Sequence, residues 1–419
     1  MYSIKLFFIA MFLGFSVVAD DGYSYFIEDP YKATFISSIT GVISNGDINS
    51  KVMKIPTLIS ERKKLPFIGR RVNTYVNVSI QKNQKKAPLM IVLGGLGSSA
   101  TSGTSKHYQS IAYKLGMHSI GVSSPFFWRY NTSESGHATP GYFERDRAEF
   151  YEYLIRVTKR VAKKRGVQFS EINLVGYSMG ALQAVFLSEL DDEKQSFNFQ
   201  KIVLVNPPID LYESTSKLDA LLATWQNLSS AEKNLNKQKL LREGYLAIKK
   251  HDKGVSLKQI IDEIELSTSE FKETIGMSFL ETLENLVLTT ELVNRRGTIE
   301  LYPDHYSPQP ALDQARQFTF IRYFNEILFP EISIYAKSND KDYLVSKMGL
   351  LLKGDYIRSN DRIRIQHNSD DIIISASDIG WIESSFPANR RVIYPRGGHL
   401  GNVWFPTNVA DFIRLITQP

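Results

Sequence analysis

From residue 72 onward, the sequence alternates short β-rich runs with stretches of helical periodicity. Val72 to Gln81 alternates apolar and polar residues, as a half-buried strand does, whereas Pro88 to Leu93 (PLMIVL) is continuously apolar. Continuous runs of this kind are typical of strands buried on both faces of a parallel sheet. Strand patterns recur at 118–122, 171–175, 201–205, 361–366 and 391–394, with helical patterns at 142–165, 179–190 and 409–416. This alternation predicts an α/β fold with a mostly parallel sheet flanked by helices.

The alternation stops after Pro207-Pro208, and the pattern becomes mainly helical until about residue 360. Apolar residues there recur at helical spacing, for example in the stripe of Leu218, Leu221, Leu222 and Trp225. The simplest division is one sheet domain, residues 72–208 and 361–419, interrupted by a large helical insertion at 209–360. Residues 20–71 form an N-terminal extension to which no pattern assigns a role.

The N-terminus carries an apolar run, Leu6 to Ala19, preceded by Lys5 and followed by two aspartates. A span of a bilayer takes about 20 apolar residues, so this run suits the apolar region of a signal peptide better than a transmembrane helix. The small residues at its end predict cleavage after Ala19, with residues 1–19 removed and the mature chain exported to the periplasm or secreted. An uncleaved membrane anchor is the alternative. Outside this run no stretch is long and apolar enough to predict a transmembrane helix in the mature chain.

Cysteine is absent from the sequence. Thiolate nucleophiles, disulfides and Cys-ligated metal sites are therefore excluded, and the chemistry must use oxygen or nitrogen nucleophiles. The net charge is +6, and its basic clusters carry no nucleic-acid motif or interleaved aromatic residues. These clusters indicate solvated faces rather than a nucleic-acid site, with peripheral attraction to anionic membrane surfaces as a secondary effect.

One pentapeptide, Gly-Tyr-Ser-Met-Gly at 176–180, matches the pattern G-x-S-x-G. A buried strand pattern precedes it and a helical pattern follows it. A serine on such a sharp strand-to-helix turn is exposed and strained, and the helix N-terminus behind it favours negative charge. Ser178 is therefore the candidate nucleophile.

A serine hydroxyl needs a base to accept its proton, and that base needs a carboxylate to orient it. His399 lies in a glycine-lined loop after the last β-rich run, and it is the base we favour. Asp371, which follows the preceding strand pattern, is our first choice for the carboxylate. Asp370 is its close rival, as a turn or capping residue, and Asp210 is a third choice.

An oxyanion hole requires two N–H donors beside the nucleophile. The backbone of Met179 follows Ser178 directly and would supply one. The glycine-rich loop at 94–97 follows the PLMIVL strand, and its Leu96 is the candidate for the other.

Together these motifs resemble the α/β-hydrolase superfamily, in its esterase and lipase-like members. The resemblance covers roughly residues 72–208 and 361–419, and it depends on four segments: LGGLG at 93–97, GYSMG at 176–180, HNSDD at 367–371 and GGHLG at 397–401. It implies an eight-stranded sheet with the insertion as a cap over the active site. The sequence departs from the commonest family pattern at Gly94, where many members carry the histidine of a His-Gly pair.

These observations predict an exported serine hydrolase that cleaves a carboxylic ester through an acyl-enzyme intermediate, with a small-molecule or lipid-like acyl ester as substrate. An acyltransferase, a thioesterase or a peptidase would use the same triad, and a non-catalytic binding protein could retain the fold. No phosphate-binding loop, dinucleotide fingerprint or metal-spaced histidine pair occurs in the sequence, so we expect no cofactor and no metal.

Overall fold

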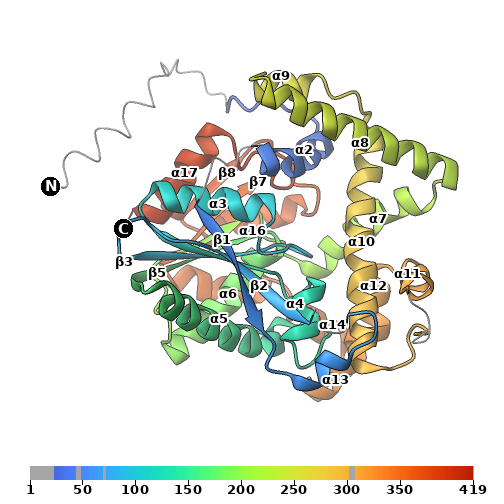
Figure 1. The fold of residues 1–419 in the computed structure, drawn as a ribbon, viewed down its shortest axis with the longest axis horizontal. Coiled ribbons are helices and arrows are strands. Elements are labelled where there is room, and N and C mark those ends of the chain that lie inside the picture. The colour runs from blue at the N-terminus through green and yellow to red at the C-terminus, as the bar shows by residue number, and fades with distance from the viewer. Residues whose placement is uncertain (1–22, 44–48, 69–71, 302–306, 419) are drawn as a thin grey trace.

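An eight-stranded sheet runs through the molecule in the order β1-β2-β4-β3-β5-β6-β7-β8 (Figure 1). The computed structural model describes residues 23–43, 49–68, 72–301 and 307–418, so the predicted signal peptide lies outside the described residues. β2 runs antiparallel to both β1 and β4, and every other neighbouring pair is parallel. The prediction of a mostly parallel α/β sheet is thereby confirmed. The strands are β1 (Ser50–Pro56), β2 (Asn73–Ser79), β3 (Lys86–Leu93), β4 (His118–Val122), β5 (Gln168–Tyr177), β6 (Ile202–Val205), β7 (Ile363–Asn368) and β8 (Arg391–Tyr394).

Helices cover both faces of this sheet. Figure 1 shows α3 (Gly103–Lys114) and α17 (Pro406–Thr417) on one side and α5 (Phe143–Arg165) and α6 (Met179–Lys194) on the other. The side chains of β3 divide between the two faces, because successive side chains of a strand point in opposite directions. Met90 and Val92 pack in the cluster that includes α3 and α17, whereas Leu89 and Ile91 pack in the larger cluster that includes α5 and α6.

Local signals end several elements where the sequence predicts. β4 and β8 have the bounds expected from their apolar runs, and α5 ends at Gly166, which takes the left-handed conformation (φ 63°) of a helix C-cap. Glycine adopts this conformation without the steric penalty of a Cβ atom.

The described part of the chain between β6 and β7 consists of helices joined by loops. Two of its long helices begin with a capping box, formed by Ser229 with Glu232 and by Ser267 with Glu270. No helix within the described part of the chain combines the length and apolar character needed to cross a bilayer. The helices of this region are α7 (Leu211–Gln226), α8 (Ser230–Asp252), α9 (Leu257–Asp262), α10 (Thr268–Asn294), α11 (Gln309–Ala315), α12 (Phe320–Tyr323), the π-helix η3 (Phe324–Leu328), α13 (Phe329–Ala336), α14 (Lys341–Ser346), η4 (Leu351–Lys353) and α15 (Gly354–Ser359).

Residues 20–71, to which no sequence pattern assigned a role, contribute an edge strand and a helix. β1 pairs with β2 over its whole length, from Ser50 opposite Ser79 to Pro56 opposite Asn73. Its lysines and terminal proline are typical of a sheet edge, where they discourage pairing with another chain. α2 (Pro30–Ile43) packs against α3 and α10. The remaining elements are η1 (Ser60–Lys64), α4 (Trp128–Ser133), α16 (Ala376–Ser385) and η5 (Ala388–Arg390).

Candidate active site

Ser178 occupies the sharp turn between β5 and α6, with φ 53° and ψ −128°. A residue other than glycine adopts such a conformation only where the surrounding structure holds it. Both neighbouring glycines are required by close packing. A Cβ atom on Gly176 would lie 2.2 Å from the carbonyl oxygen of Gly180, and one on Gly180 would lie 2.4 Å from that of Leu93. The two glycines therefore let the turn pack tightly against β3. Ser178 lies just beyond the carboxyl end of β5.

His399 comes from the loop after β8 and reaches Ser178 across the carboxyl edge of the sheet. Its Nε2 lies 2.9 Å from Ser178 Oγ, and its Nδ1 lies 2.9 and 3.0 Å from the two carboxylate oxygens of Asp371. An ionised carboxylate only accepts hydrogen bonds, so Nδ1 carries the proton of the neutral ring. Nε2 is then free to accept the proton of the serine hydroxyl.

Asp371 follows β7 and is buried. It also accepts a 2.8 Å hydrogen bond from Asn206 Nδ2, and its Oδ1 accepts the backbone N–H of Ile373. Burial raises the pKa of Asp371, but attraction and hydrogen bonding by His399, with support from His367 and Asn206, outweigh burial and hold the pKa below its ordinary value. The site therefore keeps this group as a carboxylate.

A second histidine, His367, lies 4.0 Å from Asp371 and is fully buried. Its Nδ1 lies 2.9 Å from the backbone nitrogen and 3.1 Å from the carbonyl oxygen of Asn368, and its Nε2 lies 3.0 Å from the carbonyl oxygen of Pro207. Both ring nitrogens therefore have backbone partners, and His367 packs beside the carboxylate that His399 contacts directly.

The two other candidate carboxylates lie elsewhere. Asp370 accepts the backbone N–H groups of Gly397 and Gly398 at 3.0 and 2.9 Å. Asp210 caps α7 by accepting the backbone N–H of Glu213. The structure therefore brings Asp371, and neither of the other two, to the imidazole.

Leu96 and Met179 both line the cavity that contains Ser178 and His399. Leu96 lies in the loop after β3, where Gly95 approaches the serine so closely that a Cβ atom would lie 3.0 Å from Ser178 Cβ. The hydroxyl of Tyr177 forms a 2.7 Å hydrogen bond with Ser102, behind the same loop. The two backbone N–H groups predicted to form the oxyanion hole, those of Leu96 and Met179, thus belong to two segments beside the serine.

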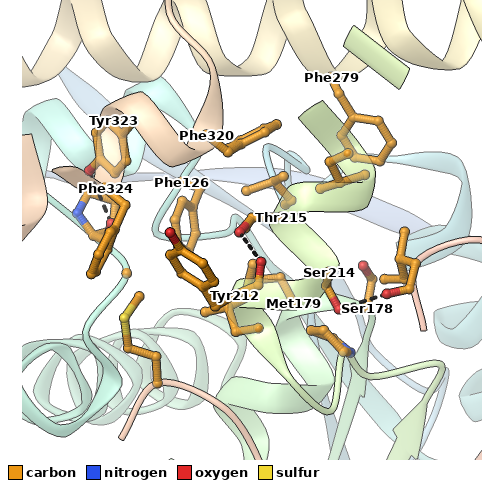
Figure 2. Close-up of a pocket in the computed structure, with 18 of the residues that line it drawn as sticks. Phe126, Ser178, Met179, Tyr212, Ser214, Thr215, Phe279, Phe320, Tyr323 and Phe324 are labelled. Carbon is orange, nitrogen blue, oxygen red and sulfur yellow. Dashed lines mark hydrogen bonds between the residues drawn. The ribbon is translucent and has the colours of Figure 1, made fainter. Parts of the chain in front are cut away.

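The cavity itself has a volume of about 60 Å³ and is mainly apolar. Three of its hydroxyl groups have carbonyl partners. Ser214 donates to Ile373, Thr215 to Tyr212 and Tyr323 to Pro140 (Figure 2). Figure 2 shows Ser178 at one end of this space and Tyr323 and Phe324 at the other. Most of the wall comes from the helical insertion, through residues such as Leu211, Leu218, Phe279, Leu286, Phe320, Leu328 and Met348.

Sequence reasoning missed Asn206 and His367 as neighbours of the carboxylate. A polar residue directly after a buried parallel strand is a usable signal for Asn206, because strand ends meet at one edge of the sheet.

Among the described residues, no cluster of three or more histidines, aspartates and glutamates is arranged to hold a metal ion.

Two observations decide the fold. β2 is antiparallel to both of its neighbours in the strand order, and the three residues of the hydrogen-bonded path follow strands of the sheet's second half: Ser178 after β5, Asp371 after β7 and His399 after β8. The chain has the α/β-hydrolase fold.

Comparisons with known proteins find solved structures at low similarity. No protein-family model matches the chain, and no curated protein matches it. A candidate hydrolase of Legionella pneumophila aligns with 11% identity and a TM-score of 0.47, covering 92% of this chain and 95% of its own. The 2,6-dihydroxy-pseudo-oxynicotine hydrolase aligns with 11% identity and a TM-score of 0.43, covering 91% and 71%. An esterase of Pyrococcus furiosus aligns with 12% identity and a TM-score of 0.41, covering 90% and 93%. Such values transfer neither activity nor substrate to this α/β-hydrolase-fold chain.

Proposed function

We propose that this protein is a serine hydrolase that cleaves carboxylic esters. Ser178 is the nucleophile, His399 the general base and acid, and Asp371 the group that orients the imidazole. The observation that carries this proposal is the continuous hydrogen-bonded path from Ser178 Oγ through both ring nitrogens of His399 to Asp371. Such a path is the arrangement that activates a serine hydroxyl.

In the acylation step, Ser178 Oγ attacks the carbonyl carbon while its proton passes to His399 Nε2. The negative charge that develops on the carbonyl oxygen is stabilised by the backbone N–H groups of Leu96 and Met179. His399 then donates its proton to the departing alkoxide, and the acyl group remains on Ser178. Water then attacks the acyl carbon while His399 Nε2 accepts one of its protons. His399 returns that proton to Ser178 Oγ as the bond between Oγ and the acyl carbon breaks, which releases the acid and restores the serine.

The apolar cavity supports an ester with a hydrocarbon acyl group. Its wall offers side chains such as Leu218, Phe320 and Phe324. Three of its hydroxyl groups, those of Ser214, Thr215 and Tyr323, donate to carbonyl oxygens. Burial of an acyl chain there gains about 0.8 kcal/mol per methylene group.

The activity is tested with a fluorophosphonate probe and a series of p-nitrophenyl esters from acetate to decanoate. We expect a mapped adduct on Ser178 and ester turnover. In Ser178→Ala we expect no adduct and a loss of kcat of at least about 10³-fold. In His399→Ala labelling should slow sharply, whereas the matched control His251→Ala, an exposed histidine of α8, should label at the wild-type rate. A folded protein that neither labels nor turns over any ester would overturn the proposal.

The same assay separates hydrolysis from acyl transfer. Addition of short alcohols during turnover should leave free acid as the main product of a hydrolase. Predominant transfer of the acyl group to the alcohol would identify an acyltransferase with the same triad.

We also propose that the chain is exported after cleavage of residues 1–19. The support is the short apolar run from Leu6 to Ala19 with its preceding lysine. N-terminal sequencing of exported material should begin at or near Asp20, and an intact Met1 on that material would contradict cleavage.

A further inference from the structure

The loop that carries His399 has an unusual backbone that needs support from outside. Gly397, Gly398 and Leu400 all have positive φ, at 152°, 55° and 67°. Three successive backbone N–H groups in this loop are bound by side chains. Asp370 accepts those of Gly397 and Gly398, and Thr34 Oγ1 accepts that of His399 at 2.8 Å.

Thr34 reaches the loop from α2, 365 residues away in the sequence. Its hydroxyl donates its only proton to the carbonyl oxygen of Pro30 at 2.7 Å. Its oxygen therefore meets the N–H of His399 as an acceptor. Thr34 is buried. Removal of its hydroxyl would therefore leave the backbone N–H of His399 without this acceptor at a site shielded from solvent, which is costly.

Backbone contacts bring α2 and the loop together with little room to adjust. A Cβ atom on Gly398 would lie 2.2 Å from the carbonyl oxygen of Pro30, and one on Gly401 would lie 2.2 Å from that of Ala33. Tyr25 adds a 3.0 Å hydrogen bond from its hydroxyl to the carbonyl oxygen of Gly401. These contacts fix the distance between helix and loop.

The opposite side of α2 packs against the helical insertion. The rings of Phe35 and Phe271, at the start of α10, lie 5.2 Å apart, and Thr268 donates a hydrogen bond to Asp29. Figure 1 shows α2 beside α8, near the upper end of α10. α2 is thus held between the insertion and the histidine loop.

We propose that Thr34 is a positioning residue for the reaction: by accepting the backbone N–H of His399, it holds the imidazole at hydrogen-bond distance from Ser178. This inference rests on the proposed function. Misplacement of a reacting group by about 1 Å can lower a rate by about 100-fold. Loss of the hydroxyl should therefore lower kcat by about 10- to 100-fold while KM stays within about twofold, because Thr34 does not line the cavity.

The test compares Thr34→Val and Thr34→Ala, which lack the hydroxyl, with Thr34→Ser, which keeps it. Thr158→Val is the matched control, since Thr158 is an equally buried helical threonine whose hydroxyl donates to the carbonyl oxygen of Leu154 in α5. We expect Thr34→Val and Thr34→Ala to lose kcat and fluorophosphonate labelling rate by the same factor. Thr34→Ser and Thr158→Val should keep both within about threefold of wild type.

An activity-independent readout is the low-field proton resonance of His399 Nδ1, assigned by its absence in His399→Ala. It should shift or broaden in Thr34→Val and Thr34→Ala and remain in place in Thr34→Ser and Thr158→Val. Unchanged kcat and an unchanged resonance in a folded Thr34→Ala would overturn the proposal, as would a Thr34→Ser variant as impaired as Thr34→Val. If wild-type protein neither labels nor turns over esters, the proposed function fails, and the resonance alone still decides whether Thr34 positions His399.

Discussion

Ser178 and His399 both lie in segments whose backbone departs from the common conformations of non-glycine residues. Ser178 itself has φ 53°, and His399 lies between Gly398 and Leu400, which both have positive φ. Each departure is held by close contacts, of Gly180 with Leu93 in one case and of Gly398 with Pro30 in the other. At the scale of single residues, this packing sets the 2.9 Å approach of imidazole and hydroxyl.

Two adjacent aspartates provide a prediction at this scale. Asp371→Asn should lower kcat by about 10³- to 10⁴-fold, because an amide can hold the imidazole in the wrong tautomer. Asp370→Asn keeps one acceptor oxygen for the histidine loop and should lower kcat by no more than about tenfold. The kcat of both variants on a short p-nitrophenyl ester, with circular dichroism to check folding, measures the difference. Equal losses in the two folded variants would contradict the distinct roles assigned to them.

The insertion contributes more than half of the residues that line the cavity beside Ser178, although Ser178 and His399 follow strands of the sheet. Its contributions come from separate helices. α7 supplies Leu211 and Leu218, α10 supplies Phe279, and α12 with η3 supplies Phe320 and Phe324. At the scale of elements, the proposed reaction therefore places bond cleavage at the sheet edge and predicts that the insertion selects the acyl group.

Phe324 lies at the end of the cavity away from Ser178 (Figure 2). Phe324→Ala should lengthen the cavity and raise the ratio of kcat/KM for decanoate to that for acetate by about tenfold, because more methylene groups could be buried. This ratio does not depend on the fraction of folded enzyme.

Phe329→Ala is the matched control, since the Phe329 ring lies 5.9 Å from that of Phe324 but does not line the cavity. Its chain-length profile should match that of wild type. A Phe324→Ala profile that also matched wild type would show that this end of the cavity does not receive the acyl group.

Charged groups buried between elements make the stability of the whole molecule depend on pH. Glu134, which follows α4, pairs with Arg156 of α5, and its side chain is 3% exposed. Burial raises the pKa of Glu134 to about 7, although Arg156 acts in the opposite direction. In the unfolded chain a glutamate has a pKa of about 4.3.

Between about pH 4.3 and 7, the folded protein therefore keeps a proton on Glu134 that the unfolded chain has released. The stability from this group is complete below pH 4.3 and is lost as pH rises to about 7. The free energy of unfolding of Glu134→Gln should fall less over this range than that of wild type, as measured by urea denaturation at intervals of half a pH unit. Glu152→Gln, which removes an exposed ion pair with Lys194, should leave the wild-type profile unchanged. Superimposable profiles for wild type and Glu134→Gln would refute the raised pKa.

The alternation of strands and helices and the glycine-flanked serine could be predicted from the sequence, because both depend on neighbours a few residues apart. Apolar periodicity is local, so it placed β4, β8 and the end of α5 at the observed residues. The same local reading supplied Ser178 and His399 and put Asp371 first among three candidate carboxylates, with Asp370 as its rival and Asp210 third. Adjacent residues share one sequence context, and only the path of the loop decides which carboxylate meets the ring.

Tertiary structure alone decided the role of the N-terminal extension and the identity of the groups around the site. Asn206 lies 165 residues from Asp371, and Thr34 lies 365 residues from His399. No periodicity or motif connects positions so far apart, since their contact depends on how the sheet, the insertion and α2 pack together. Local pattern therefore determined which groups the chain offers for the proposed chemistry, and long-range packing decided how these groups are held.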